Sequence, residues 1–186
     1  MGSGKSTVSR WFRDWGAALV KGDALGWETL RDPEVVRGLA GAFGPGLLDA
    51  SGAVDRGWLG KRVFVDDEAM QLLNRIVQPA LITRVRDVMA SSAAKTTVLD
   101  AAMVTTWGLE SELDGVVEVR SSEEVRTRRL MAARGCSRAE ALERIRGQQL
   151  PPVAGARRHW ILDNDGELAA LRRAAEAVWS EISALP

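Results

Sequence analysis

The feature that most constrains the fold is the string GSGKST, which occupies residues 2–7. It matches the second half of the phosphate-binding loop G-x-x-x-x-G-K-[ST], which joins a buried strand to a helix in nucleotide-binding proteins. The motif's spacing would put its first glycine two residues before Met1, and the strand leading into the loop would come earlier still. The sequence therefore predicts a nucleotide-binding α/β fold and a chain that begins inside the motif.

Each position of this loop has a physical role. Gly2 and Gly4 let the backbone curl so that successive N–H groups point at a phosphate. Lys5 brings a positive charge to the β- and γ-phosphates, and the Ser6 hydroxyl suits Mg²⁺. The residues predicted to bind ATP in the loop are Gly2, Ser3, Gly4, Lys5, Ser6 and Thr7. The alternative is a glycine-rich start that precedes a helix by chance, which so particular a string disfavours.

Composition narrows the class further. The chain has 186 residues, of which 46% are hydrophobic, as is typical of one globular domain. Its formal charge of zero gives no general attraction to nucleic acid or membrane. Cys136 is the one cysteine of the sequence, which excludes an intramolecular disulfide and a Cys-rich zinc site. No signal peptide precedes the loop and no apolar run would span a bilayer, so we expect a cytoplasmic monomer.

Strand-like and helical segments alternate along the chain. Short apolar runs predict strands at residues 17–20, 96–100, 116–119 and 160–162. Helices are expected at 6–14, from residue 24, and at 33–43, 55–63, 66–77, 79–89, 122–134, 137–148 and up to about 183. This alternation is typical of a parallel sheet covered by helices on both faces.

Three polar residues follow predicted strands. Asp23, Asp100 and Asn164 come at or just after strand ends. Because ligands bind at the carboxyl ends of parallel strands, we expect all three at the edge that carries the phosphate loop. A carboxylate there can help to hold a metal or accept a hydroxyl proton. The alternatives are a helix cap for Asp23, on a helix starting at Ala24, and a turn residue for Asp100.

A basic segment follows the third predicted strand. Residues 120–158 contain ten arginines and four acidic residues. Guanidinium groups bind phosphate oxygens in pairs, so the segment is suited to a lid over a polyphosphate. Because the whole chain has 21 arginines and 4 lysines, most of these arginines are expected on solvated helix faces and two or three at the nucleotide.

Taken in order, these segments resemble the dephospho-coenzyme A kinase family over nearly the whole chain. The likeness begins with the loop and its helix. Its other elements are GAALVKGDAL (16–25), the FG…G…DR…L…VF segment (43–64), LLNRIVQP (72–79), VLDAAM (98–103), RRLMAARGCSRAEALERIRGQQ (128–149) and ILDNDG (161–166). Departures from the family pattern include Lys21 for the first aspartate of an acidic pair, Gln78 for a histidine, and Thr106 for a glutamate.

The resemblance implies Mg²⁺-dependent transfer of the γ-phosphate of ATP to the ribose 3′-hydroxyl of dephospho-coenzyme A. It implies that Lys5 and Ser6 hold ATP and the metal, and that Asp23 orients or deprotonates the acceptor hydroxyl. Residues 1–186 would form one P-loop kinase domain, with a helical substrate region at about 30–92 and a lid at about 120–152. The implied substrate and lid contacts are Arg56, Asp100, Arg129 and Arg134, and Asn164 would lie near the adenine.

Two other functions stay open from the sequence. One is a kinase of the same architecture that acts on a nucleoside monophosphate or another metabolite hydroxyl. The other is an inactive nucleotide-binding remnant. In the family the first strand is central, and without it we expect a gap in the sheet whose unpaired backbone groups cost about 1–3 kcal/mol each. Either translation starts upstream, which we favour, or the chain is a natural fragment.

Overall fold

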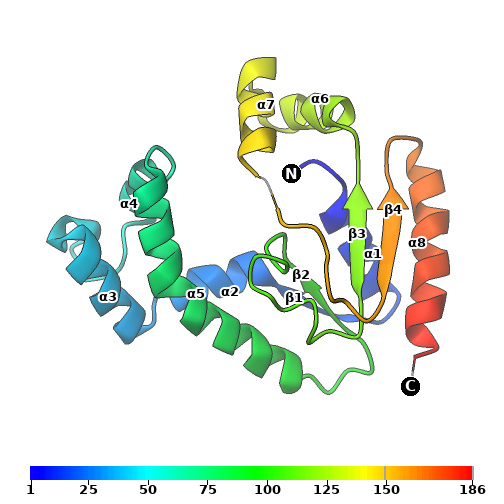
Figure 1. Ribbon diagram of the computed structural model, residues 1–186, viewed down its shortest axis with the longest axis horizontal. Coiled ribbons are helices and arrows are strands. Elements are labelled where there is room, and N and C mark those ends of the chain that lie inside the picture. The colour runs from blue at the N-terminus through cyan, green and yellow to red at the C-terminus, as the bar shows by residue number, and fades with distance from the viewer. Residues whose placement is uncertain (149, 186) are drawn as a thin grey trace. The chain divides into compact units, whose positions relative to one another are not determined.

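The computed structural model describes residues 1–148 and 150–185 (Figure 1). Residue contacts divide the chain into two compact units. Unit 1 comprises Met1–Val20 and Ala93–Pro186, and unit 2 comprises Lys21–Ser92. Within the described ranges no helix is both long enough and apolar enough to cross a membrane.

Unit 1 contains the strands, and they form two pairs. β1 (Ala18–Lys21), whose last residue is assigned to unit 2, pairs with β2 (Thr97–Asp100), and β3 (Val116–Arg120) pairs with β4 (His159–Asp163). The second pair is parallel, with Glu118 opposite Ile161. The α/β class is confirmed, but the described strands do not form one continuous sheet. The expected interruption therefore lies between the β1–β2 pair and the β3–β4 pair.

Two helices cover one face of these strands. α1 (Lys5–Asp14) and α8 (Leu168–Ser183) pack against β3 and β4 through a core that also includes Val98 of β2. Its buried members are Val8, Phe12, Ala17, Leu162, Leu171, Ala175 and Val178. Phe12 stacks on Trp179, with ring centroids 5.4 Å apart, which ties α1 to α8. The helix that follows the phosphate loop is therefore fixed along its length by unit 1's core.

The predicted lid region contains a helical hairpin. α6 (Glu123–Arg134) begins at the N-cap Ser122, and α7 (Arg138–Gly147) begins at Ser137, whose capping box with Glu140 is confirmed. The two helices share a small core of Leu130, Ala141 and Ile145. Gln149, which belongs to the predicted lid, lies outside the described residues.

Unit 2 is helical. It contains α2 (Gly22–Thr29), α3 (Pro33–Phe43), the short 3₁₀ helix η1 (Pro45–Leu47), α4 (Arg56–Val63) and α5 (Asp67–Ala90). Their apolar faces enclose a core made of Leu30, Val35, Leu39, Leu47, Val54, Leu59, Val63 and Ala69. Aspartate side chains cap three of these helices: Asp32 for α3, Asp55 for α4 and Asp66 for α5. Local sequence signals thus set most helix starts in this unit.

Two local predictions in unit 2 are wrong. The break expected between residues 77 and 79 does not occur, because α5 runs through Pro79 as one helix. A proline removes one helical hydrogen bond, and the packing of α5 on α2, α3 and α4 outweighs that loss. Asp23 is not a cap, because α2 already begins at Gly22 and its N-cap, Lys21, makes no side-chain capping bond. Asp23 lies instead in the first turn of α2.

Candidate functional site

The predicted phosphate loop is shaped by two glycines. Gly2 has a φ of 75° and Gly4 has a φ of 102°, both in the region that side chains rarely adopt. A Cβ atom at position 4 would overlap the side-chain amide of Asn164. Gly4 also serves as the N-cap of α1 and makes no side-chain cap. The first turn of α1 therefore offers its amide end to an anion without competition from a capping side chain.

Asn164 holds the loop from the end of β4. The residue is buried, with 5% of its surface exposed. Its Nδ2 donates to the carbonyl of Ser3 at 2.7 Å, and its Oδ1 accepts from Arg129 Nη2 at 3.2 Å. The backbone N–H of Asn164 donates to Arg120 O at 2.8 Å, which continues the β3–β4 pairing by one residue. Both functional atoms of this amide are used inside the protein, so its contact with adenine stays a prediction.

Two arginines of α6 reach the same loop. Arg129 Nη1 donates to Ser121 Oγ at 3.1 Å and lies 3.5 Å from the carbonyl of Gly2. Arg126 Nε donates to the carbonyl of Met1 at 2.8 Å. The base of the predicted lid is thus bonded to the loop that it was expected to cover. Arg134, the last residue of α6, is exposed, and among the described residues no side-chain bond joins it to the loop.

Lys5 and Asp100 form an ion pair where β2 ends. Lys5 Nζ donates to Asp100 Oδ1. The other carboxylate oxygen, Oδ2, lies 2.9 Å from Ser9 Oγ. The Asp100 side chain is 10% exposed and that of Lys5 is 38% exposed. The expectation that Asp100 and Asn164 lie beside the phosphate loop is therefore confirmed. Ser9 was missed by sequence reasoning, although its i+4 spacing from Lys5 places it on the same helix face.

The hydroxyl groups of the loop differ in exposure. Ser6 is exposed at the start of α1, and Thr7 is half-buried, with Oγ1 3.5 Å from Arg10 Nη2. Among residues 1–148 and 150–185 no three His, Cys, Asp or Glu side chains gather in a way that could hold a metal. Magnesium commonly takes one or two protein oxygens together with phosphates and water. An exposed Ser6 hydroxyl beside a phosphate loop suits that mode of binding.

Unit 2 carries the other predicted site residues. Asp23 is exposed in the first turn of α2, and its side chain bonds no other residue of the described ranges. Its position relative to the loop stays a prediction. The Arg56 guanidinium lies 3.6 Å from the ring centroid of Trp27, a cation–π contact. Trp27 is 47% exposed although it is large and apolar. It carried no motif, so sequence reasoning missed it.

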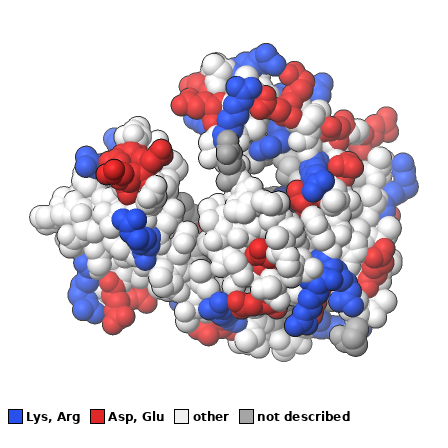
Figure 2. Space-filling view, in the orientation of Figure 1, with Lys and Arg blue, Asp and Glu red and all other residues white. Residues whose placement is uncertain are grey.

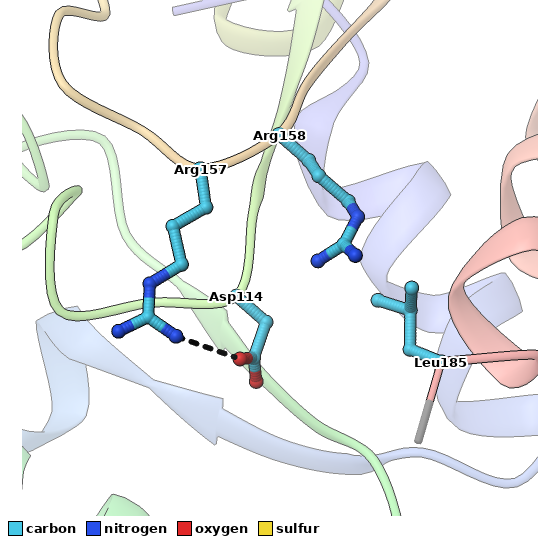
Figure 3. A pocket seen from close by; sticks show the side chains of 4 residues that line it. All are labelled: Asp114, Arg157, Arg158 and Leu185. Atoms are coloured by element: carbon cyan, nitrogen blue, oxygen red, sulfur yellow. Dashed lines mark ion pairs between the residues drawn. The ribbon is translucent and has the colours of Figure 1, made fainter.

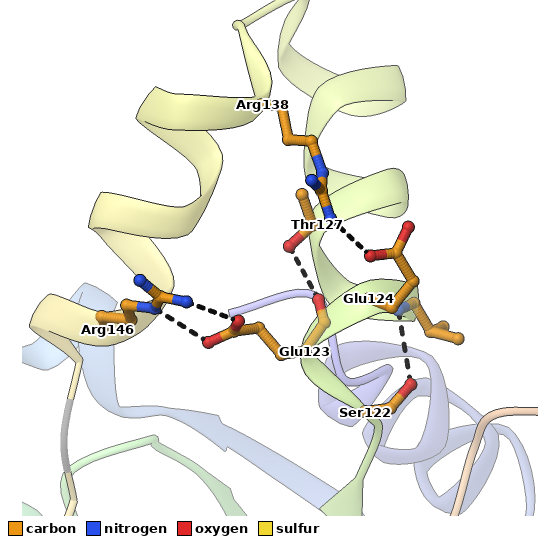
Figure 4. A network of polar contacts seen from close by, with 7 residues as sticks. Ser122, Glu123, Glu124, Thr127, Arg138 and Arg146 are labelled. Atoms are coloured by element: carbon orange, nitrogen blue, oxygen red, sulfur yellow. Dashed lines mark hydrogen bonds and ion pairs between the residues drawn. The ribbon is translucent and has the colours of Figure 1, made fainter.

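Two arginines of the lid helices form ion pairs on the surface. Arg138 Nη2 lies 2.7 Å from Glu124 Oε2, and Arg146 Nη2 lies 2.9 Å from Glu123 Oε1 (Figure 4). Hydrogen bonds from Arg146 lower the pKa of Glu123. Figure 2 shows the two signs of charge interspersed over α6 and α7. This supports the expectation that most of these arginines lie on solvated helix faces.

A separate cavity of about 430 Å³ lies at the other end of the β3–β4 pair. It is lined by Asp114, Arg157, Arg158 and Leu185 (Figure 3). Asp114 and the two arginines precede these parallel strands, whereas Ser121 and Asn164 follow them. Arg157 Nη1 lies 3.8 Å from Asp114 Oδ1. This cavity is therefore not part of the phosphate-loop site.

Comparison with known proteins gives one consistent family. A family model described as dephospho-CoA kinase matches residues 1–170. A dephospho-CoA kinase of Geobacillus kaustophilus is 34% identical over 98% of this chain and 93% of its own length. One of Mycolicibacterium paratuberculosis is 37% identical over 97% of this chain. The chain spans 45% of the length of that mycobacterial relative.

Two solved structures share this fold. The crystal structure of TT1252 from Thermus thermophilus is 33% identical, with a TM-score of 0.77 over 97% of this chain and 93% of that one. A dephospho-CoA kinase from Campylobacter jejuni is 19% identical, with a TM-score of 0.67 over 98% of this chain and 93% of that one. At that identity the second likeness supports the fold alone.

Proposed function

Because the chain belongs to the dephospho-CoA kinase family, we propose that it transfers the γ-phosphoryl group of ATP to the ribose 3′-hydroxyl of dephospho-coenzyme A. This transfer is the last step of coenzyme A synthesis. The observation that carries the proposal is the family match over residues 1–170, which includes a phosphate loop already held in a curled shape. We expect a cytoplasmic monomer. Neither a nucleic acid nor a membrane surface is expected as a partner, because a formal charge of zero gives no general attraction to either.

The phosphate loop supplies the ATP site. Backbone N–H groups of residues 2–7 and the amino end of α1 surround the β-phosphate. Lys5 turns from Asp100 to the β- and γ-phosphates and stabilises the charge that develops on the transferring group. Mg²⁺, held by the Ser6 hydroxyl and the phosphates, would neutralise the same oxygens. The lid contributes Arg129, whose guanidinium is already beside the loop, and Arg134, whose exposed side chain is available to phosphate.

Asp23 and Arg56 serve the acceptor. The 3′-oxygen forms a bond to the γ-phosphorus, the bond from that phosphorus to the bridging oxygen of ADP breaks, and the hydroxyl proton passes to the Asp23 carboxylate. Arg56 binds the diphosphate of dephospho-coenzyme A through its guanidinium. The exposure of both side chains supports these roles, because neither would have to break a buried contact to meet a ligand.

The proposal is tested by a competition between acceptors. Purified protein with Mg-ATP is given dephospho-coenzyme A, a mixture of nucleoside monophosphates, or no acceptor, and ADP release is followed. We expect release only with dephospho-coenzyme A, together with a product that gains one phosphate on the ribose. Preferred turnover of a nucleoside monophosphate would overturn the substrate assignment. ATP binding without turnover of any acceptor would instead indicate a nucleotide-binding remnant.

A further inference from the structure

A buried serine links the phosphate-loop helix to the end of β2. Ser9 is 5% exposed and lies in the second turn of α1. Its hydroxyl is 2.9 Å from the carbonyl of Lys5 and 2.9 Å from Asp100 Oδ2. A serine has one proton to donate. A carboxylate is the stronger acceptor of the two, so the proton is better placed on Asp100.

The Asp100 carboxylate depends on few partners. It is 10% exposed, and within the described part of the chain its side-chain partners are Lys5 on Oδ1 and Ser9 on Oδ2. A charge this deeply buried is costly unless it is paired and hydrogen-bonded. With the loop free of nucleotide, Lys5 supplies the charge. ATP changes this balance, because its phosphates carry more negative charge than one carboxylate and draw the ammonium group toward themselves.

We propose that Ser9 is a positioning residue that holds the Asp100 carboxylate in place when Lys5 leaves it for the phosphates of ATP. The proposal rests on the ATP-binding role proposed above for Lys5. Ser9 acts through Asp100 and does not itself touch the substrate. In this arrangement Lys5 donates first to Asp100 and then to the phosphates of ATP, whereas Asp100 accepts from the Ser9 hydroxyl throughout. Loss of the hydroxyl would let the carboxylate rotate away from the substrate contact that the family resemblance implies for Asp100.

A purely structural role for Ser9 is the alternative to be separated. Serine hydroxyls in helices often bond the carbonyl four residues back, and such a bond affects only the helix. Thr29 in α2 offers a matched case, because it is 3% exposed and its hydroxyl donates to Leu25 O at 2.8 Å. Among the described residues no carboxylate bonds the Thr29 hydroxyl. Thr29→Val therefore removes a buried helical hydroxyl without the feature that distinguishes Ser9.

The experiment is a double-mutant cycle on the full chain. Wild type, Ser9→Ala, Asp100→Ala and the double variant are compared with Thr29→Val. For each protein kcat and KM for ATP with dephospho-coenzyme A are measured, together with the ATP dissociation constant and the thermal midpoint. We expect Ser9→Ala to lower kcat about tenfold in the wild-type background, as for a lost hydrogen bond to a charged group, with little change in KM for ATP. In the Asp100→Ala background it should change kcat less than about twofold.

The outcomes separate the hypotheses. An equal loss of kcat with and without Asp100, or the same loss in Thr29→Val, would reduce Ser9 to a helix-stabilising residue. If Ser9→Ala lowers the thermal midpoint too far to assay, Ser9→Cys keeps the size of the side chain, and its kcat should fall between those of serine and alanine. If wild type phosphorylates no acceptor, the proposed function fails, yet the cycle is still read from thermal midpoints taken with saturating Mg-ATP. Additive effects of Ser9→Ala and Asp100→Ala on that midpoint would overturn the Ser9 proposal on its own terms.

Discussion

The two units present their predicted site residues in opposite ways. In unit 1, Lys5, Asn164 and Arg129 are each bonded within the protein before any ligand is present. In unit 2, Asp23 is exposed and its side chain bonds no other described residue, and Arg56 rests on the face of an exposed indole. The nucleotide side is thus preorganised by its own contacts, whereas the acceptor side presents groups that a ligand would have to engage. Substitutions on the first side should affect both stability and turnover, and those on the second should affect turnover alone.

The largest effect is expected at Lys5. Lys5→Ala removes the charge that stabilises the transferring phosphoryl group, and turnover should fall by about a hundredfold or more. It also leaves the buried Asp100 without its ion-pair partner, so the thermal midpoint should fall as well. Steady-state ADP release and a thermal scan measure the two effects. Lys61→Ala, an exposed lysine of α4, is the control. A loss of activity below about tenfold would contradict the assigned role.

Asp23 offers the converse test in unit 2. Asp23→Asn keeps the size of the side chain and removes its charge, and kcat should fall on the order of tenfold to a hundredfold, as for a lost general base. ATP affinity and the thermal midpoint should stay near those of wild type, because the carboxylate is exposed. Asp67, exposed in the first turn of α5, gives the matched control Asp67→Asn. A kcat equal to that of wild type would leave Asp23 as an ordinary surface residue.

Gly4 tests the preorganisation of the loop directly. Gly4→Ala forces a side chain onto a φ of 102° and into the amide of Asn164. We expect a destabilisation of about 1–3 kcal/mol, which lowers the thermal midpoint by about 2–4 °C for each kcal/mol in a chain of this size. ATP binding, measured by titration calorimetry, should weaken as well. Gly147→Ala is the control, because the added Cβ meets nothing within 4 Å beyond its chain neighbours and its own helix backbone, and it should not destabilise α7. Equal midpoints for the two variants would mean that the loop adapts freely.

The smallest effect is a pH dependence on the open face of unit 1's strands. Hydrogen bonds from Arg120 hold the pKa of Glu118 below its ordinary value of 4.5. A lowered carboxyl pKa adds stability that is present above the ordinary value and is lost as the pH falls through the lowered one. The thermal midpoint of wild type should therefore approach that of Glu118→Gln as the pH drops from about 6 to about 3. The control repeats the comparison in an Arg120→Gln background. If the thermal midpoints of Arg120→Gln and of the Arg120→Gln, Glu118→Gln double variant converge in the same way, Arg120 is not the cause of the lowered pKa of Glu118.

Whether the sequence predicts a structural feature depends on how far apart along the chain the interacting residues lie. Helix starts such as Ser122 and Ser137 follow from contacts within one turn, and the structure confirms them. Pro79 misled the prediction because a local penalty was outweighed by the packing of a whole helix. The bond from Asn164 to Ser3 and that from Ser9 to Asp100 join distant segments, which no local pattern encodes. The motif identified the loop residues, but not the groups that hold them.

The attachment of the loop to Asn164 also affects the order in which the chain can become functional during synthesis. Residues 2–7 leave the ribosome well before the side chains that hold them, which come from α6 and from the end of β4. Contacts between such distant segments form late, because a long stretch of chain must be closed to make them. A nascent chain therefore carries its nucleotide motif for most of its synthesis without the geometry to use it. ATP can stabilise the protein only after residue 164 has emerged.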